Sequence, residues 1–397
     1  MANISIQFVI STASLFEILI LALFYLIVPK LTILCLLFFI FYIILNAKIL
    51  KHPSKIVKQK SMKCFELIPI FSEYHFRYTK AKIPYIGPKQ VLIEVHLGAI
   101  NPVDVKVNFS LIPFKRWLKS NIMGFDVCGK IIELGNEVTE FKIGETVFGI
   151  ANSGSLAEYA VCNVHQIWKV SNEEKKEELG ASVVTGVTSY QSLIWFFKEN
   201  ELAGKNILVI GASGGCGSIA CQLAKFLKFK KVVGVCSDKN LNYVSTICDV
   251  AISYNYSDLD IKLKNEGKFD IILDTVSSGE DGDMHKKYIQ FIDTDGKYIQ
   301  LNGNKIDVIK GALASMYPFL KNLKGFEPKN FHCHLMNTDI CQIGLKRLDE
   351  IFRDNNNIHV KLEKLQLNND GLKAGFDKIK SRRTVGKIIF EIKPKNL

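Results

Sequence analysis

The first fifty positions of the chain are mostly apolar, whereas the positions after them alternate between short apolar segments and polar turns. Between Ile4 and Val28 the single charged residue is Glu17, and residues 31–45 carry no charge. A helix that spans a bilayer needs about 20 mainly apolar residues. The pattern therefore predicts a membrane anchor in residues 1–50, made of one or two transmembrane helices.

Pro29 and Lys30 interrupt this apolar stretch and leave two arrangements open. The first is a hairpin of two helices that turns at Pro29-Lys30, with both ends on the same side of the membrane. The second is a single tilted helix, which would place the Lys30 ammonium deep in hydrocarbon at a high cost in free energy. The hairpin is therefore favoured. A cleaved signal peptide fits less well, because no basic segment precedes an apolar stretch that is too long.

Six lysines between Lys48 and Lys63 follow the apolar stretch and carry half of the formal net charge of +12. Positive residues beside a membrane segment remain in the cytosol, so the rest of the chain is expected to face the cytosol. Attraction to anionic lipid is a second interpretation of the same charges. The organelle stays open between the endoplasmic reticulum, the plasma membrane and the outer mitochondrial membrane. No basic patch interleaved with aromatic residues follows, so no nucleic-acid partner is expected.

The residues after the lysines show two different patterns. From about residue 65 to 184, β-branched segments at 90–100, 128–135, 146–150 and 157–163 are separated by glycine-containing turns. From about residue 185, strands alternate with helical segments. Candidate strands are 206–211, 231–236, 249–254, 269–276, 296–303 and 330–336. Six strands with intervening helices predict an α/β fold with a doubly wound parallel sheet.

The composition changes this picture little. Hydrophobic residues make up 48% of the chain and charged residues 23%, which excludes a disordered or collagen-like chain. No two of the ten cysteines are spaced as Cys-x-x-Cys. A structural zinc lobe is therefore not expected, and scattered thiols fit a reducing compartment.

A glycine-rich loop lies between a predicted strand and a predicted helix in ILVIGASGGCGSIACQLAK, residues 207–225. Glycine permits the tight turn and lets the backbone approach a pyrophosphate. The helix N-terminus adds free N–H groups and the positive end of the helix dipole. A purely structural turn is the alternative. The candidate cofactor-binding residues of the loop are Gly211, Ser213, Gly214, Gly215, Cys216 and Gly217.

The second strand of this unit lacks the terminal acidic residue that would bind the ribose of NAD. It ends instead in Val-Cys-Ser237-Asp238-Lys239. The Ser237 hydroxyl and the Lys239 ammonium can bind a ribose 2′-phosphate, which favours NADP(H). An inward-turned Asp238 would repel that phosphate. Tyr254, at the end of the third strand, is included among the cofactor-binding candidates.

Besides the glycine-rich loop, several segments occur in a fixed order: NPVDVK (101–106), MGFDVCG (123–129), ELGNEVTEFKIGETVFG (133–149), GSLAEY (154–159), VVTGVTSYQSL (183–193) and VGKI (385–388). Together they closely resemble the medium-chain dehydrogenase/reductase superfamily, in its zinc-independent quinone oxidoreductase branch. The chain also resembles fungal zinc-type alcohol dehydrogenase-like proteins. The resemblance implies a β-rich GroES-like catalytic domain interrupted by a Rossmann domain.

The expected organisation follows from this resemblance together with the apolar segment. It comprises a membrane anchor in residues 1–50, a polybasic linker in 51–64, a GroES-like catalytic domain in 65–184, a Rossmann NADP-binding domain in 185–345 and a C-terminal return to the catalytic domain in 346–397. Members of this family are often dimers joined near the sixth strand of the sheet. A homodimer is accordingly one expectation for this chain.

The positions that hold zinc in zinc-dependent relatives carry other residues here. Those relatives have a Cys where Asn101 stands and a His-Glu pair where Phe125-Asp126 stand. Asn is a poor zinc ligand and Phe is none, so no metal is expected. The reaction is then one that NADPH itself carries out. His332 and His334 share a face of a predicted strand and are interpreted as packing or surface residues.

The resemblance implies transfer of hydride to a quinone or to an α,β-unsaturated carbonyl compound. Asn101 is expected near the nicotinamide and the substrate carbonyl, where a developing oxyanion needs a hydrogen-bond donor. Lys106 is a second donor candidate or only a surface cation, and Asp104 is expected to accept structural hydrogen bonds. Ligands bind at the carboxyl ends of such strands. Further cofactor contacts are therefore expected from Thr188, Asp274, Thr275, Val276, Leu301 and Asn302, although Asp274 could instead only cap a turn.

Three functions remain open on the sequence, the third being a lipid-modifying reductase whose hairpin also shapes the substrate entrance. The first is a membrane-anchored, NADPH-dependent, zinc-free reductase that faces the cytosol, where tethering suits a lipid-soluble quinone or a lipid-derived aldehyde. The second is a membrane-associated scaffold or trafficking factor that retains the reductase fold with little or no activity, because a fold does not dictate a function.

Overall fold

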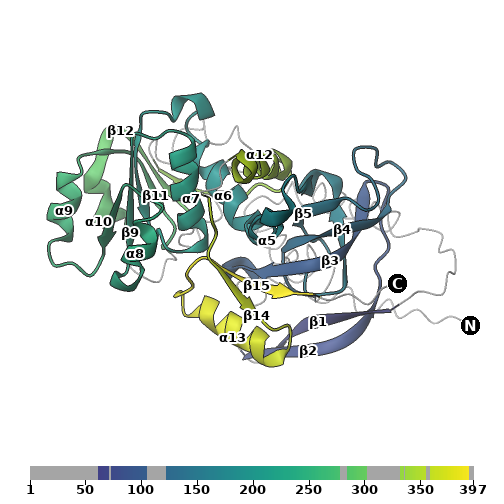
Figure 1. The fold of residues 1–397 in the computed structure, drawn as a ribbon. Helices are drawn as coiled ribbons and strands as arrows, with labels where there is room; N and C mark the ends of the chain where they lie inside the picture. Colours follow the sequence, from purple (N-terminus) through teal and green to yellow (C-terminus); the bar gives the residue numbers. More distant parts are fainter. Residues whose placement is uncertain are drawn as a thin grey trace, which may run out of the picture.

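The computed structural model describes residues 61–70, 73–104, 122–277, 284–301, 331–334, 336–354 and 358–392. Within these residues a six-stranded sheet and a seven-stranded sheet lie beside each other, and a two-stranded ribbon lies below them (Figure 1). The predicted α/β fold with a β-rich part and a parallel sheet is confirmed. The predicted anchor in residues 1–50 and the linker up to residue 60 lie outside the described residues.

The six-stranded sheet is parallel at every strand pair, as the repeated strand–helix pattern predicts. Its order is β10-β9-β8-β11-β12-β13. The strands are β8 (Asn206–Ile210), β9 (Lys231–Cys236), β10 (Val250–Ser253), β11 (Phe269–Asp274), β12 (Ile292–Gln300) and β13 (Phe331–Cys333). Chain order reverses between β8 and β11, and this reversal is where ligands bind in such sheets.

Both faces of this sheet are covered, which explains why its strands are apolar at successive positions. Ile207 and Val209 of β8 pack in one core with α6 (Val183–Leu193), α7 (Gly215–Phe226) and α12 (Cys341–Asp354). Leu208 and Ile210 pack on the opposite face with α9 (Leu259–Asn265) and α10 (Met284–Tyr288). The shorter helices are α5 (Lys176–Ala181), α8 (Leu241–Val244) and the 3-10 turns Val164–Gln166, Glu173–Lys175, Glu199–Glu201, Asp238–Asn240 and Ile289–Phe291.

The seven-stranded sheet is assembled from both ends of the described chain. Its order is β14-β15-β3-β4-β5-β7, and β6 pairs with β3. The strands are β3 (Gln90–Ile100), β4 (Asp126–Leu134), β5 (Thr146–Ile150), β6 (Tyr159–Asn163), β7 (Ile167–Lys169), β14 (Leu362–Leu365) and β15 (Lys387–Glu391). β15 runs antiparallel to β3, with Ile388 opposite Ile100. The last strand therefore completes the sheet that the third one began.

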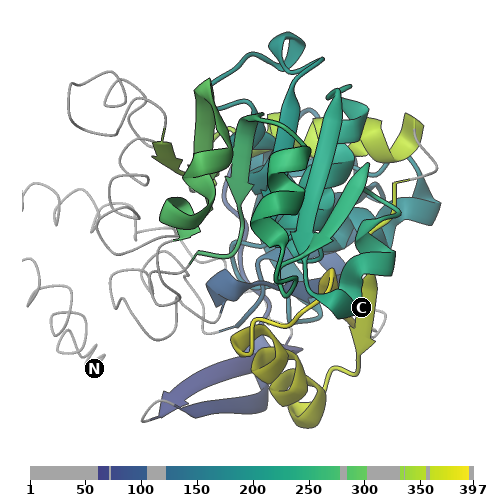
Figure 2. The same ribbon diagram turned by 90° about the vertical axis from the view of Figure 1, so that its left-hand side faces the viewer.

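The ribbon of β1 (Ser61–Ile70) and β2 (Glu73–Lys82) is not among the predicted strands. The last four residues of the predicted linker, 61–64, are the first four of β1. Met62 and Cys64 are buried whereas Ser61 is exposed, which is the two-residue alternation of a strand. The lysines around this segment obscure that alternation. The ribbon lies beside α13 (Asn369–Lys380), as the two views in Figures 1 and 2 show.

The helix α12 crosses the predicted domain boundary between residues 345 and 346. Leu345, Leu348 and Phe352 lie on one face of this helix and are buried against α6 and β8 in one core. Because these apolar positions recur at helical spacing, the segment is one amphipathic helix and the boundary does not coincide with the end of an element.

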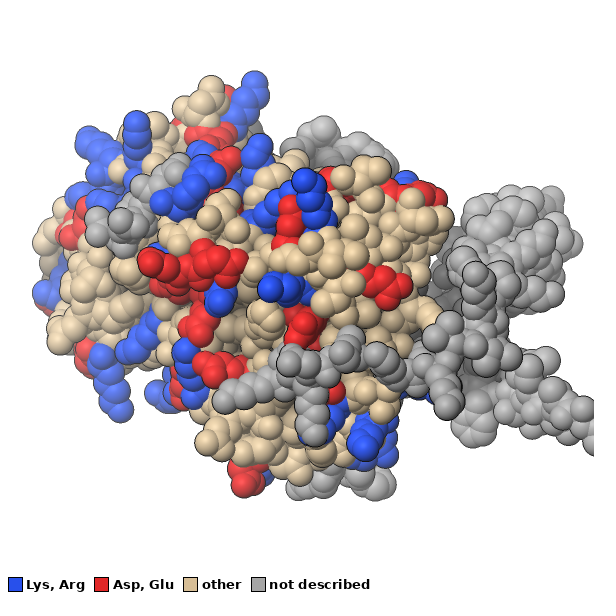
Figure 3. Space-filling view, turned by 45° about the vertical axis from the view of Figure 1, so that its right-hand side comes forward, with Lys and Arg blue, Asp and Glu red and all other residues tan. Residues whose placement is uncertain are grey.

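No helix among the described residues is both long and apolar enough to cross a membrane. On the face of the molecule in Figure 3, Lys and Arg side chains are interspersed with Asp and Glu.

Candidate functional site

The glycine-rich loop connects the end of β8 to the start of α7. Gly211 has φ of +81°, and a Cβ added to it would lie 2.6 Å from Thr275 Oγ1 and from Val276 Cγ2. A Cβ on Gly217 would lie 2.2 Å from the Gly211 carbonyl oxygen. Both positions therefore require glycine, for backbone conformation at the first and for close helix–strand packing at the second.

The outer side of the same loop is open to a ligand. A Cβ added to Gly214 would meet only the Gly211 carbonyl oxygen, at 3.4 Å. α7 begins at the next residue, Gly215, and no side chain caps its first N–H groups. The loop also contacts the far end of the chain, because Gly386 donates its N–H to the Ser213 carbonyl at 3.0 Å. The segment before β15 is thus part of the loop's surroundings.

A buried charged cluster lies beside the loop, at the first residue of β15. Lys387 is 3% exposed, and its Nζ lies 2.9 Å from Asp126 Oδ2. The same ammonium donates to Asn101 Oδ1 and, at 3.4 Å, to the Ile100 carbonyl. A Cβ added to Gly215 would lie 3.2 Å from Lys387 Cδ, so the lysine stem passes the start of α7. Sequence reasoning did not select Lys387.

Two carboxylates complete this cluster. Asp126 Oδ1 accepts the Val184 N–H at 2.9 Å, while Asp104 accepts the N–H groups of Asn101 at 2.7 Å and of Gly124 at 3.2 Å. The expectation that Asp104 accepts structural hydrogen bonds matches this placement. Burial raises the pKa of Asp104 to about 7, although the hydrogen bond from Asn101 opposes the shift. Burial also raises the pKa of Asp126, and Lys387 opposes that change.

Three buried polar atoms around the cluster have no hydrogen-bond partner among the described residues: Asn101 Nδ2, Thr185 Oγ1 and Thr384 Oγ1. Thr185 lies beside the loop, because its Cγ2 is 3.0 Å from a Cβ added to Gly215. Buried polar groups in proteins almost always have a partner. These atoms are therefore available to form hydrogen bonds with a polar ligand.

Thr188, the predicted cofactor contact on α6, donates its hydroxyl to the Val184 carbonyl at 2.6 Å. Thr185, one helical turn earlier, is the threonine whose hydroxyl has no described partner. Residues three apart share a helix face, so the pair Thr185 and Thr188 is a signal that the sequence already contained.

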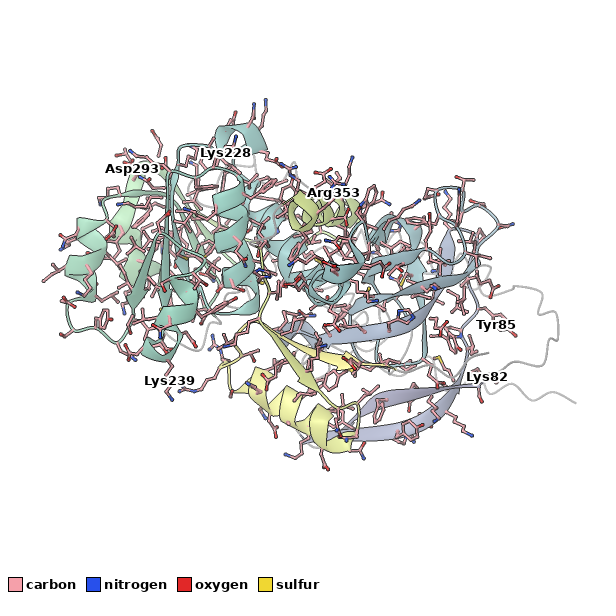
Figure 4. All side chains as sticks on the ribbon, viewed as in Figure 1. Lys82, Tyr85, Lys228, Lys239, Asp293 and Arg353 are labelled. Carbon is pink, nitrogen blue, oxygen red and sulfur yellow. The ribbon has the colours of Figure 1, made fainter. Side chains whose placement is uncertain are left out.

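The predicted 2′-phosphate residues gather at the end of β9. The Asn240 side-chain amide donates to Ser237 Oγ at 3.1 Å and to Ser213 Oγ at 3.0 Å, which ties this end to the glycine loop. Lys239 extends outward on the side nearer to α13 (Figure 4), and Tyr254 is 47% exposed. Asp238 accepts a hydrogen bond from Asn255 at 2.7 Å, which lowers its pKa and holds its carboxylate toward the end of β10.

Asp274 is predicted to contact the nicotinamide ribose, but the hydrogen bonds to its carboxylate come from groups of the protein itself. Its carboxylate accepts the N–H groups of Val276 at 2.9 Å and Ser277 at 3.0 Å. It also accepts the hydroxyls of Ser277 and, at 2.9 Å, of Tyr298. This placement favours the alternative in which Asp274 caps a turn.

The neighbours of Asp274 at the strand ends also have local contacts. The Thr275 hydroxyl donates to the Ile210 carbonyl at 2.8 Å, and Val276 packs against Gly211. Leu301 donates its N–H to the Asp274 carbonyl at 2.9 Å. The remaining two predicted site residues, Lys106 and Asn302, lie outside the described residues.

Cys216 and the two histidines show no reactive environment. Burial raises the pKa of the Cys216 thiol to about 11, so the start of α7 does not stabilise a thiolate there. His332 and His334 are buried, and Trp195 stacks on His332 with 3.9 Å between ring centroids, which agrees with a packing role. Within the described ranges no group of three or more His, Cys, Asp or Glu is arranged to hold a metal ion.

The residues present fit a dinucleotide. The open glycine loop at a helix N-terminus suits a pyrophosphate, and the linked serines of the loop and of β9 suit a ribose with its phosphate. Two of the buried atoms without a described partner lie near the start of α7, since Thr185 approaches Gly215 and Asn101 contacts Lys387.

The comparisons with known proteins agree with this geometry. The alcohol dehydrogenase GroES-like domain matches residues 87–172. The trans-enoyl reductase pgmF of Aspergillus terreus is 28% identical over 327 residues, which cover 77% of this chain and 87% of that protein. The 2-methylene-furan-3-one reductase of Solanum lycopersicum is 30% identical over 235 residues, 56% of this chain and 57% of that protein.

The solved quinone oxidoreductase of Coxiella burnetii has the same fold, with a TM-score of 0.66 and 22% identity, and the match covers 84% of this chain and all of that one. The GroES-like match, the relatives and the shared fold thus agree with one another. They show that residues 87–172 are similar to an alcohol dehydrogenase GroES-like domain and that the fold is that of a solved quinone oxidoreductase.

Proposed function

We propose that the chain is an NADPH-dependent reductase that acts without zinc on a quinone or an α,β-unsaturated carbonyl compound. The observation that carries this proposal is the buried Asn101 Nδ2 atom, which has no acceptor among the described residues and lies in the cluster beside the glycine loop. A donor in that position suits a carbonyl oxygen that gains negative charge during reduction.

Bound NADPH supplies the hydride. The open side of Gly214 and the start of α7 would hold its pyrophosphate, and Ser237, Lys239 and Tyr254 would bind its 2′-phosphate. Asn101 would orient the substrate by donating a hydrogen bond to its carbonyl oxygen.

The residues at the zinc positions of the family support a metal-free site. Asn101 and Phe125 are poor ligands, and both oxygens of Asp126 are engaged, one by Lys387 and one by Val184. The relatives named trans-enoyl reductase and 2-methylene-furan-3-one reductase support a substrate in which a carbon–carbon double bond adjoins a carbonyl.

The proposal includes a membrane anchor in residues 1–50 that holds the reductase at the cytosolic surface. The mainly apolar residues 4–45 and the six lysines after them support this location. Tethering would place the site near lipid-soluble substrates. Membrane lipid and a second copy of the chain are the proposed partners, and nucleic acid is not.

The test uses the full-length chain in detergent micelles. NADPH and NADH are titrated by nucleotide fluorescence, and a panel of quinones and enones is then added while absorbance of the reduced nicotinamide is followed. We expect tighter binding of NADPH than of NADH, with turnover of at least one acceptor class. If neither nucleotide binds, the reductase proposal fails and the scaffold alternative replaces it.

A matched pair of lysine variants tests the 2′-phosphate site. Lys239 and Lys228 lie at opposite ends of the Rossmann part in Figure 4. Lys239→Ala should weaken NADPH binding about ten-fold and leave NADH unchanged, because one charge-assisted hydrogen bond is lost. Lys228→Ala should change neither affinity.

A further inference from the structure

The Lys387 ammonium has three N–H donors, and three acceptors surround it. They are Asp126 Oδ2 at 2.9 Å, the Ile100 carbonyl at 3.4 Å and Asn101 Oδ1. An ammonium donates and never accepts, so the atom of the Asn101 amide that faces it must be the oxygen. The NH2 group, at the other corner of the planar amide, then points away from the ammonium, and it has no hydrogen-bond partner among the described residues.

We propose that Lys387 is a positioning residue that fixes the Asn101 side chain with its oxygen inward and its NH2 group toward the substrate carbonyl. This inference rests on the proposed reductase function. It assigns the orientation of the amide to a residue from β15, which lies 286 positions further along the chain.

Burial and three hydrogen-bond acceptors fix the position of the Lys387 ammonium. Its side chain is 3% exposed, and Asp126 is itself fixed by the Val184 N–H. Because all three ammonium donors have acceptors, none remains for a phosphate group of the cofactor. The Asn101 backbone N–H is held separately by Asp104, so the amide can rotate only about its side-chain bonds.

The opposite orientation of the amide is doubly unfavourable. It would set the NH2 group against the ammonium, donor against donor, and leave one ammonium proton buried without an acceptor. It would also present an oxygen to the substrate carbonyl. By donating a hydrogen bond to the Asn101 oxygen, Lys387 therefore leaves the NH2 group of Asn101 as the donor for a ligand, although Lys387 itself contacts no ligand.

The main experiment compares two variants of the full-length chain in detergent. Asp126→Asn removes one charge, keeps the lysine and sets the baseline. Asp126→Asn/Lys387→Met removes both charges, so no unpaired carboxylate is left at position 126. We expect the double variant to have kcat about ten-fold below the baseline with an unchanged dissociation constant for NADPH, the loss of one hydrogen bond to a charged group. Asp126→Asn/Lys387→Arg, which keeps a donor, should recover kcat.

The possible results distinguish a failure of the positioning role of Lys387 from a failure of the proposed reductase function. Equal kcat in the baseline and the double variant would overturn the positioning role while the reductase function stands. Weaker NADPH binding in the double variant would also overturn it, since Lys387 would then act on the nucleotide. A wild-type chain that neither binds NADPH nor turns over would overturn the function and the inference together.

A second variant keeps the test decisive if the double variant does not fold. Asn101→Asp preserves an oxygen acceptor for Lys387 but replaces the outward NH2 group with a second oxygen. We expect this variant to fold, to bind NADPH normally and to lose about a hundred-fold in kcat, as on removal of an oxyanion donor. Wild-type turnover by this variant would contradict the inference.

Discussion

Asp126 and Asp274 are both fully buried carboxylates at the cofactor edge, yet their surroundings differ. The Asp274 carboxylate accepts hydrogen bonds from four donors, three of them within three residues of it. Asp126 is balanced by Lys387, which comes from a strand 261 positions away, and the next group in that network, Asn101, keeps a buried donor with no described partner. A carboxylate whose hydrogen bonds all come from nearby residues, as in Asp274, is typical of a structural turn. A network between distant strands that leaves a buried donor without a partner, as around Asp126, is typical of a ligand site.

The two clusters also differ in what they do for stability. Neutral hydrogen bonds to a buried carboxylate contribute modestly and favourably. A buried ion pair is costly to desolvate and contributes less than an apolar pair of the same volume. We interpret the Asp126–Lys387 pair as a device that specifies the geometry of Asn101, with the cost in stability offset elsewhere in the core.

Removing the lysine alone should have the largest effect. Lys387→Met leaves the Asp126 carboxylate buried without a cation and should lower the free energy of unfolding by about 3–5 kcal/mol. Denaturant unfolding of the full-length chain, followed by tryptophan fluorescence, measures this. The added Asp126→Asn change should restore most of the loss. A cost below about 1 kcal/mol for the single variant would mean that the pair is not charged.

Removing the other carboxylate should affect stability but not the cofactor. Asp274→Ala leaves the N–H groups of Val276 and Ser277 and the Tyr298 hydroxyl without their acceptor. The free energy of unfolding should fall by about 2–3 kcal/mol. The dissociation constant for NADPH, measured by fluorescence, should change less than about two-fold. A large loss of NADPH affinity at unchanged stability would instead assign Asp274 to the ribose.

The Lys387 cluster contains a second carboxylate, Asp104, and should therefore make stability depend on pH. Burial raises the pKa of Asp104 from an ordinary 3.8 to about 7. The folded chain then binds more protons than the unfolded chain, so this contribution is present below pH 3.8 and is lost as pH rises toward 7. Unfolding measured at pH 5 and pH 7 should differ by up to about 2 kcal/mol from this group.

Asp104→Asn is the control for that pH dependence. It removes the titrating group, so the difference in stability between the two pH values should shrink. If the variant and the wild type show the same slope against pH, Asp104 does not titrate in this range.

The smallest expected effect concerns one donor at the saturated cluster. Tyr298→Phe removes the hydroxyl that donates to Asp274 Oδ2 and leaves three donors in place. The free energy of unfolding should fall by about 1 kcal/mol, with kcat and NADPH affinity unchanged. A fall in kcat would show that this cluster, too, reaches the reacting groups.

The parts of the site that depend on local sequence could be predicted, and the rest could not. The glycine loop is recognisable because strand, glycines and helix are contiguous. Lys387 is not, because a lysine at the start of a strand is usually exposed, and its acceptors come from β3 and β4. The spacing shows that Thr185 and Thr188 share a helix face, but nothing local shows which of the two hydroxyls bonds to the helix backbone.

The fold shows the same division. The parallel sheet follows from repeated apolar segments and is confirmed by the strand order. The ribbon of β1 and β2 is missed because its alternation begins inside a lysine-rich segment. The extent of α12 is missed because one helix serves the cores of both sheets.

The contact between Gly386 and the glycine loop has a consequence for biosynthesis. On the ribosome, the loop and both carboxylates of the Lys387 cluster are made long before the segment that closes them. A nascent or truncated chain that stops short of β15 would carry the cofactor signature while two acidic groups have no cation to neutralise them. The charged cluster is therefore complete only in a folded chain that includes β15.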